Sequence, residues 1–205
     1  MTAKSFWFRC ITNQMFNDIN RHIMVVWQSI GVLIGAFAIF ALVEKNIVSL
    51  DVAVTLIVLL TAWLAAHLLD ASYWYNRNLV IIANIERQFL KNDDLRDIHY
   101  YFGAHRPKNR MITHLKIQVA LGIGLGLIVL GYHASIRVIP GISSPLTAFE
   151  FSRALPYLVS VASLIYVALT SKGRDAAYEE FLRNSPGGNV DASNITYGPG
   201  HGHDA

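Results

Sequence analysis

Two ionisable side chains near the end of an apolar stretch are the first candidates for chemistry. His67 and Asp70 lie three residues apart in the run LTAWLAAHLLDASYW and would share one face of a helix. Ionisable residues in such segments often serve ion pathways or proton transfer. His67 could share a proton with Asp70, but the other apolar segments supply no further carboxylate, so the pair is no proton relay. We expect a structural role for Asp70, by pairing with Arg77 or capping a neighbouring chain; the alternative is a cation-attracting ring at an oligomer mouth.

A second group of polar residues could in principle bind a metal ion, and contains Asp93, Asp94, Asp97, His99, His105 and His114. None of its spacings matches an HExxH or CxxC site, so we predict no metal and no other cofactor. The chain also lacks a GxSxG elbow and a phosphate-binding glycine loop. These absences favour a non-enzymatic protein. An enzyme would instead be expected to depend on His67, Asp70, His99 or His105.

Four apolar segments must position these residues, at about 24–43, 52–72, 112–134 and 155–171. The chain of 205 residues is 53% hydrophobic and only 15% charged. A bilayer core about 30 Å thick needs roughly 20 apolar residues per helical crossing, and each segment is close to that length. The sequence therefore predicts an all-α, polytopic membrane protein with four transmembrane helices in two hairpins, surrounded by the lipid bilayer.

The distribution of Lys and Arg predicts the orientation. Of the 17 cationic residues, all but Lys45, Arg137 and Arg153 lie before the first segment, between the second and third, after the fourth, or, for Lys116, one turn inside the start of the third. Cytoplasmic loops carry such an excess of positive charge. We expect the protein to lie in a cell inner (plasma) membrane. Both termini and the polar insert (70–110), which separates the second and third apolar segments, should then be cytoplasmic. The net charge of +3, with acidic residues interleaved, argues against a nucleic-acid partner.

These predictions divide the chain into five parts. Trp7, Ile11, Met15 and Ile19 recur every four residues, which indicates an amphipathic helix lying at the membrane surface or packed on the cytosolic insert. The predicted parts are an interfacial helix (1–23), a first hairpin (24–72), a cytosolic helical module (73–111), a second hairpin (112–171), and a short helix with a disordered tail (172–205).

The second apolar segment should continue as one long helix. No Pro or Gly occurs from Asp51 to Lys91, which permits about 40 helical residues, with half of them projecting into the cytosol. An aromatic belt marks the interface with the membrane and comprises Trp27, Tyr73, Trp74 and Tyr75.

Small residues spaced four apart predict close helix packing. Gly31 and Gly35 lie in the first segment, and Gly122 and Gly126 in the third. Both segments would enter from the same side, with these glycines roughly 10 to 21 Å from the boundary. We therefore expect the two helices to approach closely, within one subunit or between two.

The layout of residues 5–91 resembles the SLATT-type small membrane proteins of bacterial conflict systems. The shared features are an amphipathic N-terminal helix, a tight hairpin and a long helical extension, here SYWYNRNLVIIANIERQFL. The resemblance implies a pore-forming or membrane-perturbing effector controlled by a cytosolic partner. The second hairpin, 112–171, is additional to the two-helix plan of that group.

The sequence thus favours a homo-oligomeric membrane protein, either a regulated pore or an effector, whose cytosolic helices receive a protein partner or signal. One alternative is a membrane anchor or assembly subunit of a larger complex. Another is a small transporter or membrane-embedded enzyme. A transporter would have helices broken by Gly or Pro at the midplane, and the first two segments contain no Pro.

Overall fold

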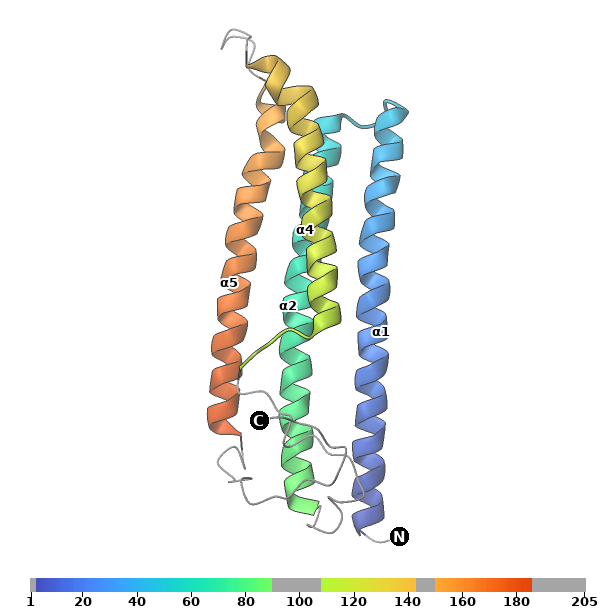
Figure 1. The fold of residues 1–205 in the computed structure, drawn as a ribbon, viewed down its shortest axis with the longest axis vertical. Coiled ribbons are helices and arrows are strands. Elements are labelled where there is room, and N and C mark those ends of the chain that lie inside the picture. The colour runs from blue at the N-terminus through green and yellow to red at the C-terminus, as the bar shows by residue number, and fades with distance from the viewer. Residues whose placement is uncertain (1–2, 90–107, 143–149, 186–205) are drawn as a thin grey trace. The chain divides into compact units, whose positions relative to one another are not determined.

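The chain folds into long helices. The computed structural model describes residues 3–89, 108–142 and 150–185, and within these ranges it contains no strand. Four α-helices are each long and apolar enough to cross a membrane, which confirms the all-α prediction (Figure 1). They are α1 (Ala3–Glu44), α2 (Leu50–Phe89), α4 (Thr113–His133) and α5 (Leu155–Asn184). Short helical turns follow α4 and precede α5: η1 (Ala134–Val138), η2 (Ile139–Gly141) and η4 (Phe151–Ala154).

Three of these helices continue past the ends of the predicted apolar segments. α2 is a single helix of 40 residues, which confirms the prediction of one unbroken helix. α1 has 42 residues, so the boundary predicted at residue 23 is not a helix end. The sequence contains no Gly or Pro before Gly31, so nothing interrupts the backbone hydrogen bonds in the first part of α1. The side chains of Trp7, Ile11, Met15 and Ile19 lie outside the described part of the structure.

The same continuity holds at the C-terminal helix, where a new helix was expected after Gly173. α5 runs through this residue without a break for 30 residues. A glycine inside a helix costs only about 1 kcal/mol relative to alanine, which the surrounding helical residues offset.

A tight turn joins α1 to α2. Asn46 adopts a left-handed conformation with φ of 55°. Its N–H donates to the carbonyl of Val43, and the N–H of Ile47 donates to the carbonyl of Leu42. This is the Schellman pattern of helix termination, and asparagine is one of the few residues that adopt its left-handed position readily. The hydroxyl of Ser49 then accepts a hydrogen bond from the N–H of Val52 and caps α2.

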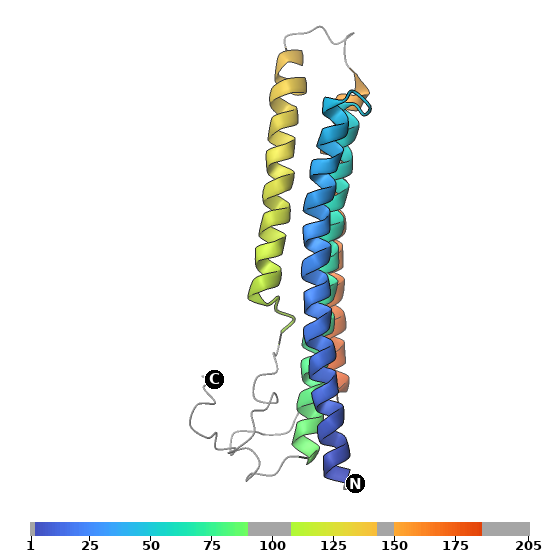
Figure 2. The same cartoon turned by 90° about the vertical axis from the view of Figure 1, so that its right-hand side faces the viewer.

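The chain divides into two compact units, which are described separately. The apolar unit comprises 24–69 and 112–172, and the polar unit comprises 1–23, 70–111 and 173–205. Within the apolar unit the helical segments run alongside one another in alternating directions (Figures 1 and 2). Their core is formed by Ala36, Val54, Ile57, Val58 and Val129.

The second helix is the central element of the apolar unit. In the most apolar stretch of α2, 33% of the residues are buried. The corresponding share is 17% in α1, 17% in α4 and 6% in α5. Within this chain the glycines of the third apolar segment face α2 and not the glycines of the first, while their contact between two subunits stays a prediction. A Cβ added at Gly122 would lie 3.2 Å from Leu64, and one at Gly126 would lie 3.5 Å from Thr61. Both neighbours belong to α2, so the small residues of α4 make room for its larger side chains.

The first helix follows the same rule. A Cβ added at Gly35 would lie 3.8 Å from Leu60 of α2, whereas one added at Gly31 would meet no described atom within 4 Å. The helices α1 and α4 also contact each other, through a 2.8 Å hydrogen bond from the Ser29 hydroxyl to the side-chain oxygen of Gln118 and through the rings of Phe40 and Tyr132, whose centres are 6.4 Å apart. The side chains of Ser29 and Gln118 are both buried.

Candidate functional site

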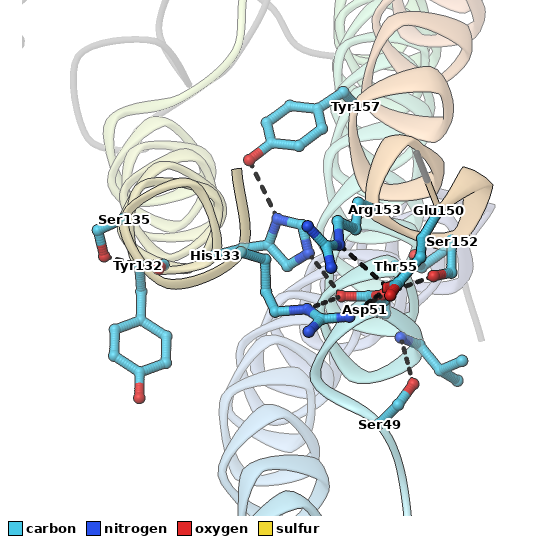
Figure 3. A network of polar contacts seen from close by, with 12 residues as sticks. Ser49, Asp51, Thr55, Tyr132, His133, Ser135, Glu150, Ser152, Arg153 and Tyr157 are labelled. Carbon is cyan, nitrogen blue, oxygen red and sulfur yellow. Dashed lines mark hydrogen bonds and ion pairs between the residues drawn. The ribbon is translucent and has the colours of Figure 1, made fainter. Parts of the chain in front are cut away.

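A buried carboxylate organises a polar network at one end of the apolar unit. Asp51 lies in the first turn of α2, and its side chain is only 3% exposed. It draws together the end of α4, the turn η1 and the segment that begins α5 (Figure 3). The set, called here the Asp51 network, comprises Asp51, His133, Arg137, Glu150, Ser152, Arg153 and Tyr157.

Four hydrogen bonds engage the two oxygens of Asp51. Its Oδ1 accepts from His133 Nε2 at 3.1 Å and from Arg137 Nε at 3.0 Å. Its Oδ2 accepts from Arg137 Nη2 at 3.2 Å and from the Ser152 hydroxyl at 2.7 Å. The two-pronged contact with Arg137 is the strong geometry for a guanidinium and a carboxylate. With all of its acceptor positions in use, Asp51 is fixed in place as a structural anion.

The imidazole of His133 bridges two elements and is fully buried. A carboxylate can only accept hydrogen bonds, so Nε2 of His133 carries a hydrogen and donates it in the hydrogen bond to Asp51. The second ring nitrogen, Nδ1, lies 3.0 Å from the Tyr157 hydroxyl on α5. In the neutral imidazole this nitrogen accepts from the tyrosine. His133 therefore ties α2 to α5 from its position at the end of α4.

Two further charges complete the network toward solvent. Glu150 accepts 3.0 Å hydrogen bonds from Arg137 and from Arg153. The hydrogen bond from Arg153, together with the positive charges of both guanidinium groups, lowers the pKa of Glu150 below its ordinary value. Two carboxylates thus balance two guanidinium groups. The arrangement fastens helix ends to one another and leaves no unpaired charge inside.

A wide helical turn brings Arg137 to this position. α4 ends at His133, and the next five residues form the π-helical turn η1, followed by the 3-10 turn η2. Short 3-10 turns are common at the ends of α-helices and in the connections between them. A Cβ added at Gly141 would lie 2.9 Å from Arg153 Nη1, so glycine leaves room for that guanidinium.

The predicted site residue His67 has different partners from those expected. Its Nε2 lies 2.6 Å from the side-chain oxygen of Gln28. Its ring stacks on Trp63, with ring centres 5.2 Å apart and an angle of 3° between the planes. These contacts hold the imidazole on the surface of the apolar unit, where it is half-buried.

Asp70 and Arg77 are both in the polar unit, but they do not pair as expected. Asp70 forms an ion pair with Arg174 of α5. Residues seven apart on a helix are separated by about 10 Å along its axis, so an arginine on the facing helix reaches the carboxylate more easily. Arg77 instead lies between two aromatic rings, 4.8 Å from the centre of Trp74 and 5.1 Å from that of Phe181.

Further side chains join these residues into a second polar group. Asn76 is fully buried, and its Nδ2 donates to Asn109 Oδ1 at 2.9 Å and to the Arg110 carbonyl at 3.0 Å. The side-chain oxygen of Asn76 and the Nε of Arg77 are buried without a hydrogen-bond partner. The group, called here the Arg77 cluster, comprises Asp70, Tyr73, Trp74, Asn76, Arg77, Arg174, Tyr178 and Phe181.

The predicted aromatic belt is only partly exposed. Trp27 is 63% exposed and Trp74 is 37% exposed, as a belt requires. Tyr73 is buried against Tyr178, with ring centres 6.5 Å apart, which corrects the expectation that it faces the surface. Tyr75 is half-buried. Consecutive helical residues point in different directions, so three in a row cannot all face lipid.

The polar residues that were weighed as metal ligands, other than His114, lie outside the described residues. His114 is exposed at the start of α4. Among the residues that the structure describes, no group of three or more His, Cys, Asp or Glu side chains is arranged to hold a metal ion.

The Asp51 network was missed by sequence reasoning, although one signal for it was present. The weakly charged side of the predicted bilayer holds three cations, and Arg137 and Arg153 are two of them. Cations on that side of the membrane require anions to balance them. Asp51 and Glu150 are on the same side of the predicted membrane, so pairing was foreseeable.

No protein-family model matches the chain, and comparisons with curated proteins and with solved structures found no match. The function must therefore be argued from the two polar groups and the helices that carry them.

Proposed function

We propose that the chain is a multi-pass inner (plasma) membrane protein with both termini in the cytoplasm, and that it assembles with copies of itself into a regulated pore or membrane effector. Support for membrane insertion comes from the large apolar side chains on the surface of the apolar unit. Ile34, Phe37, Ile128, Leu164 and Leu169 are between 64% and 72% exposed. A water-soluble protein rarely exposes so many contiguous apolar side chains.

A conducting path would have to form between copies rather than through one chain. The interior of the apolar unit is filled by side chains such as Val54, Ile57 and Val129, each at most 1% exposed. Surface residues with polar groups, such as His67 with Gln28, are then the candidates to line such a path. A Cβ added at Gly31 would meet no described atom within 4 Å, so this side of α1 is open to a second copy.

The observation that carries the regulatory part of the proposal is the continuity of the helices. α2 and α5 each run without a break from the apolar unit into the polar unit. A partner that binds the polar ends of these helices more tightly in one arrangement than in another would shift the population of the membrane part. The resemblance of residues 5–91 to SLATT-type proteins favours the same scheme.

Two measurements test this proposal. The mass of the protein purified in mild detergent should be a multiple of the single-chain mass, and liposomes containing it should release trapped ions. A stable second protein at fixed stoichiometry, with no flux, would favour the alternative of a membrane anchor or assembly subunit. Reporter fusions near residue 95 that prove to be outside the cytoplasm would overturn the topology.

The position of Asp70 on any conducting path is tested separately. Asp70→Asn should lower cation flux if the carboxylate lies at the mouth, because a negative charge raises the local cation concentration. Glu180→Gln removes the same charge from an exposed position on α5 and serves as the control. Equal flux in both variants would remove Asp70 from the path while leaving the pore intact.

A further inference from the structure

Arg77 is a half-buried cation without a carboxylate partner among the described residues. Its neighbour in the Arg77 cluster, Arg174, lies 5.0 Å from the ring centre of Tyr73 and is neutralised by Asp70. Among the described residues, the contacts of the Arg77 guanidinium are with the rings of Trp74 and Phe181, and its Nε is buried with no acceptor. A buried guanidinium N–H without an acceptor is costly. An anion supplied from outside the chain would compensate the positive charge of this half-buried guanidinium.

The two rings prepare the guanidinium for such an anion. Trp74 is one helical turn before Arg77 on α2, and Phe181 reaches it from α5. Stacked on aromatic faces, a guanidinium keeps its planar edge free for a two-pronged contact with phosphate oxygens. Trp74 is also 37% exposed, so an apolar surface adjoins the charge.

The position of Arg77 along α2 identifies the source of the anion. The predicted apolar segment ends at residue 72, five residues earlier. At 1.5 Å per residue this places Arg77 about 7 Å beyond the hydrocarbon core, within the layer of lipid headgroups. A cationic head with an aromatic ring on its apolar side is the arrangement expected of an interfacial anchor.

We propose that Arg77 binds the phosphate of an anionic membrane lipid, with Trp74 and Phe181 holding the guanidinium plane and Trp74 contacting the apolar part of the lipid. The inference rests on the proposed insertion in the membrane. It does not depend on pore activity, so the two proposals can fail independently.

Native mass spectrometry of the full chain in detergent tests this site, with dioleoyl phosphatidylglycerol and phosphatidylcholine as the added lipids. We expect selective retention of phosphatidylglycerol by the wild type. Arg77→Gln should weaken this binding about tenfold, since it removes charge-assisted hydrogen bonds to the phosphate. Arg183→Gln removes the same charge from an exposed position on α5 and should bind as the wild type does. Equal binding by the Arg77→Gln and wild-type proteins, or an equal loss in Arg183→Gln, would overturn the site.

Two more variants and one competitor complete the test. Arg77→Lys keeps the charge but loses the planar fork, and Phe181→Leu removes one ring, so both should bind the lipid more weakly. If Arg77→Gln fails to fold, unchanged binding in these two variants contradicts the proposal. Displacement of the lipid by millimolar inorganic phosphate would show a site for the free anion and overturn the lipid assignment. Absence of lipid binding in a chain whose reporter fusions confirm membrane crossing would refute this inference alone.

Discussion

The Asp51 network and the Arg77 cluster are built from similar residues but differ in how completely they are satisfied. In the Asp51 network each carboxylate has two guanidinium or imidazole donors, and Asp51 alone accepts four hydrogen bonds. In the Arg77 cluster, Asp70 has one arginine, while the side-chain oxygen of Asn76 and the Nε of Arg77 are buried without a hydrogen bond.

This difference indicates that the Asp51 network holds helices together, whereas the Arg77 cluster has groups available to a ligand. A fully paired network in a low-dielectric setting holds its elements in one geometry, and the loss of a single member leaves the others unpaired. A cluster with unmet donors and acceptors gains stability only when something outside it supplies the missing groups. The comparison makes the first group structural and the second the place where a ligand or partner should act.

The largest effect is expected from Asp51→Asn. The substitution leaves the Arg137 guanidinium with only the exposed Glu150 as a counter-charge and takes an acceptor oxygen from Ser152 or His133. Breaking a buried pair in this way costs about 3 kcal/mol, or roughly 6 to 12 °C in the thermal midpoint. Circular dichroism in detergent measures it, and Asp175→Asn, at an exposed position, is the control. A fall no larger than that of the control would contradict the fastening role.

His133→Ala should follow at about 2 kcal/mol, since it removes a fully buried ring and two hydrogen bonds. Tyr157→Phe removes only the hydroxyl that contacts Nδ1 and should cost about 1 kcal/mol. The same unfolding measurement compares the two variants. If both cost equally, the contact with Asp51 adds nothing to the contact with Tyr157.

In the Arg77 cluster, the pair between Asp70 and Arg174 should couple weakly. The two side chains are 36% and 37% exposed, so solvent screens their attraction. A double-mutant cycle of Asp70→Asn and Arg174→Gln should give a coupling energy of about 0.5 kcal/mol. A coupling energy as large as the loss of unfolding free energy in Asp51→Asn would contradict the proposed difference between the two polar groups.

The smallest effect concerns Glu150 and depends on pH. Its pKa in the folded chain is lowered from an ordinary value of 4.5, so its contribution to stability is present above that pH and is lost as the pH falls. The thermal midpoints of the wild type and Glu150→Gln should therefore differ at neutral pH and converge in acid. A constant difference across this range would exclude the ionised carboxylate as the cause.

The sequence was informative wherever the signal was local. Apolar segments of sufficient length and the absence of Gly and Pro after Asp51 were enough to predict four long helices and the unbroken α2. The hydrogen-bond partners of the polar side chains, by contrast, are far away in the sequence. The partners of Asp51 lie 82, 86 and 101 residues away, and only the packing of the helices decides which side chains meet.

The errors have the same physical origin. Spacing along one helix suggested Arg77 as the partner of Asp70, but a residue on the neighbouring helix reached it at lower cost. Matching depth suggested that the glycines of α1 and α4 approach each other; within this chain Gly122 and Gly126 face side chains of α2, and contact between two copies stays a prediction. In both cases the missing information was which side chain faces which helix.

The tight turn at Asn46 has a consequence for biosynthesis. α1 and α2 can associate as soon as both have left the ribosome, because only five residues, 45–49, connect them. Asp51 then lacks its hydrogen bonds with His133 and Arg137 until α4 and η1 have been synthesised. We expect the nascent first hairpin to carry an exposed, unneutralised carboxylate at its tip, and closure of the network to occur only once the remaining half of the polypeptide has been inserted.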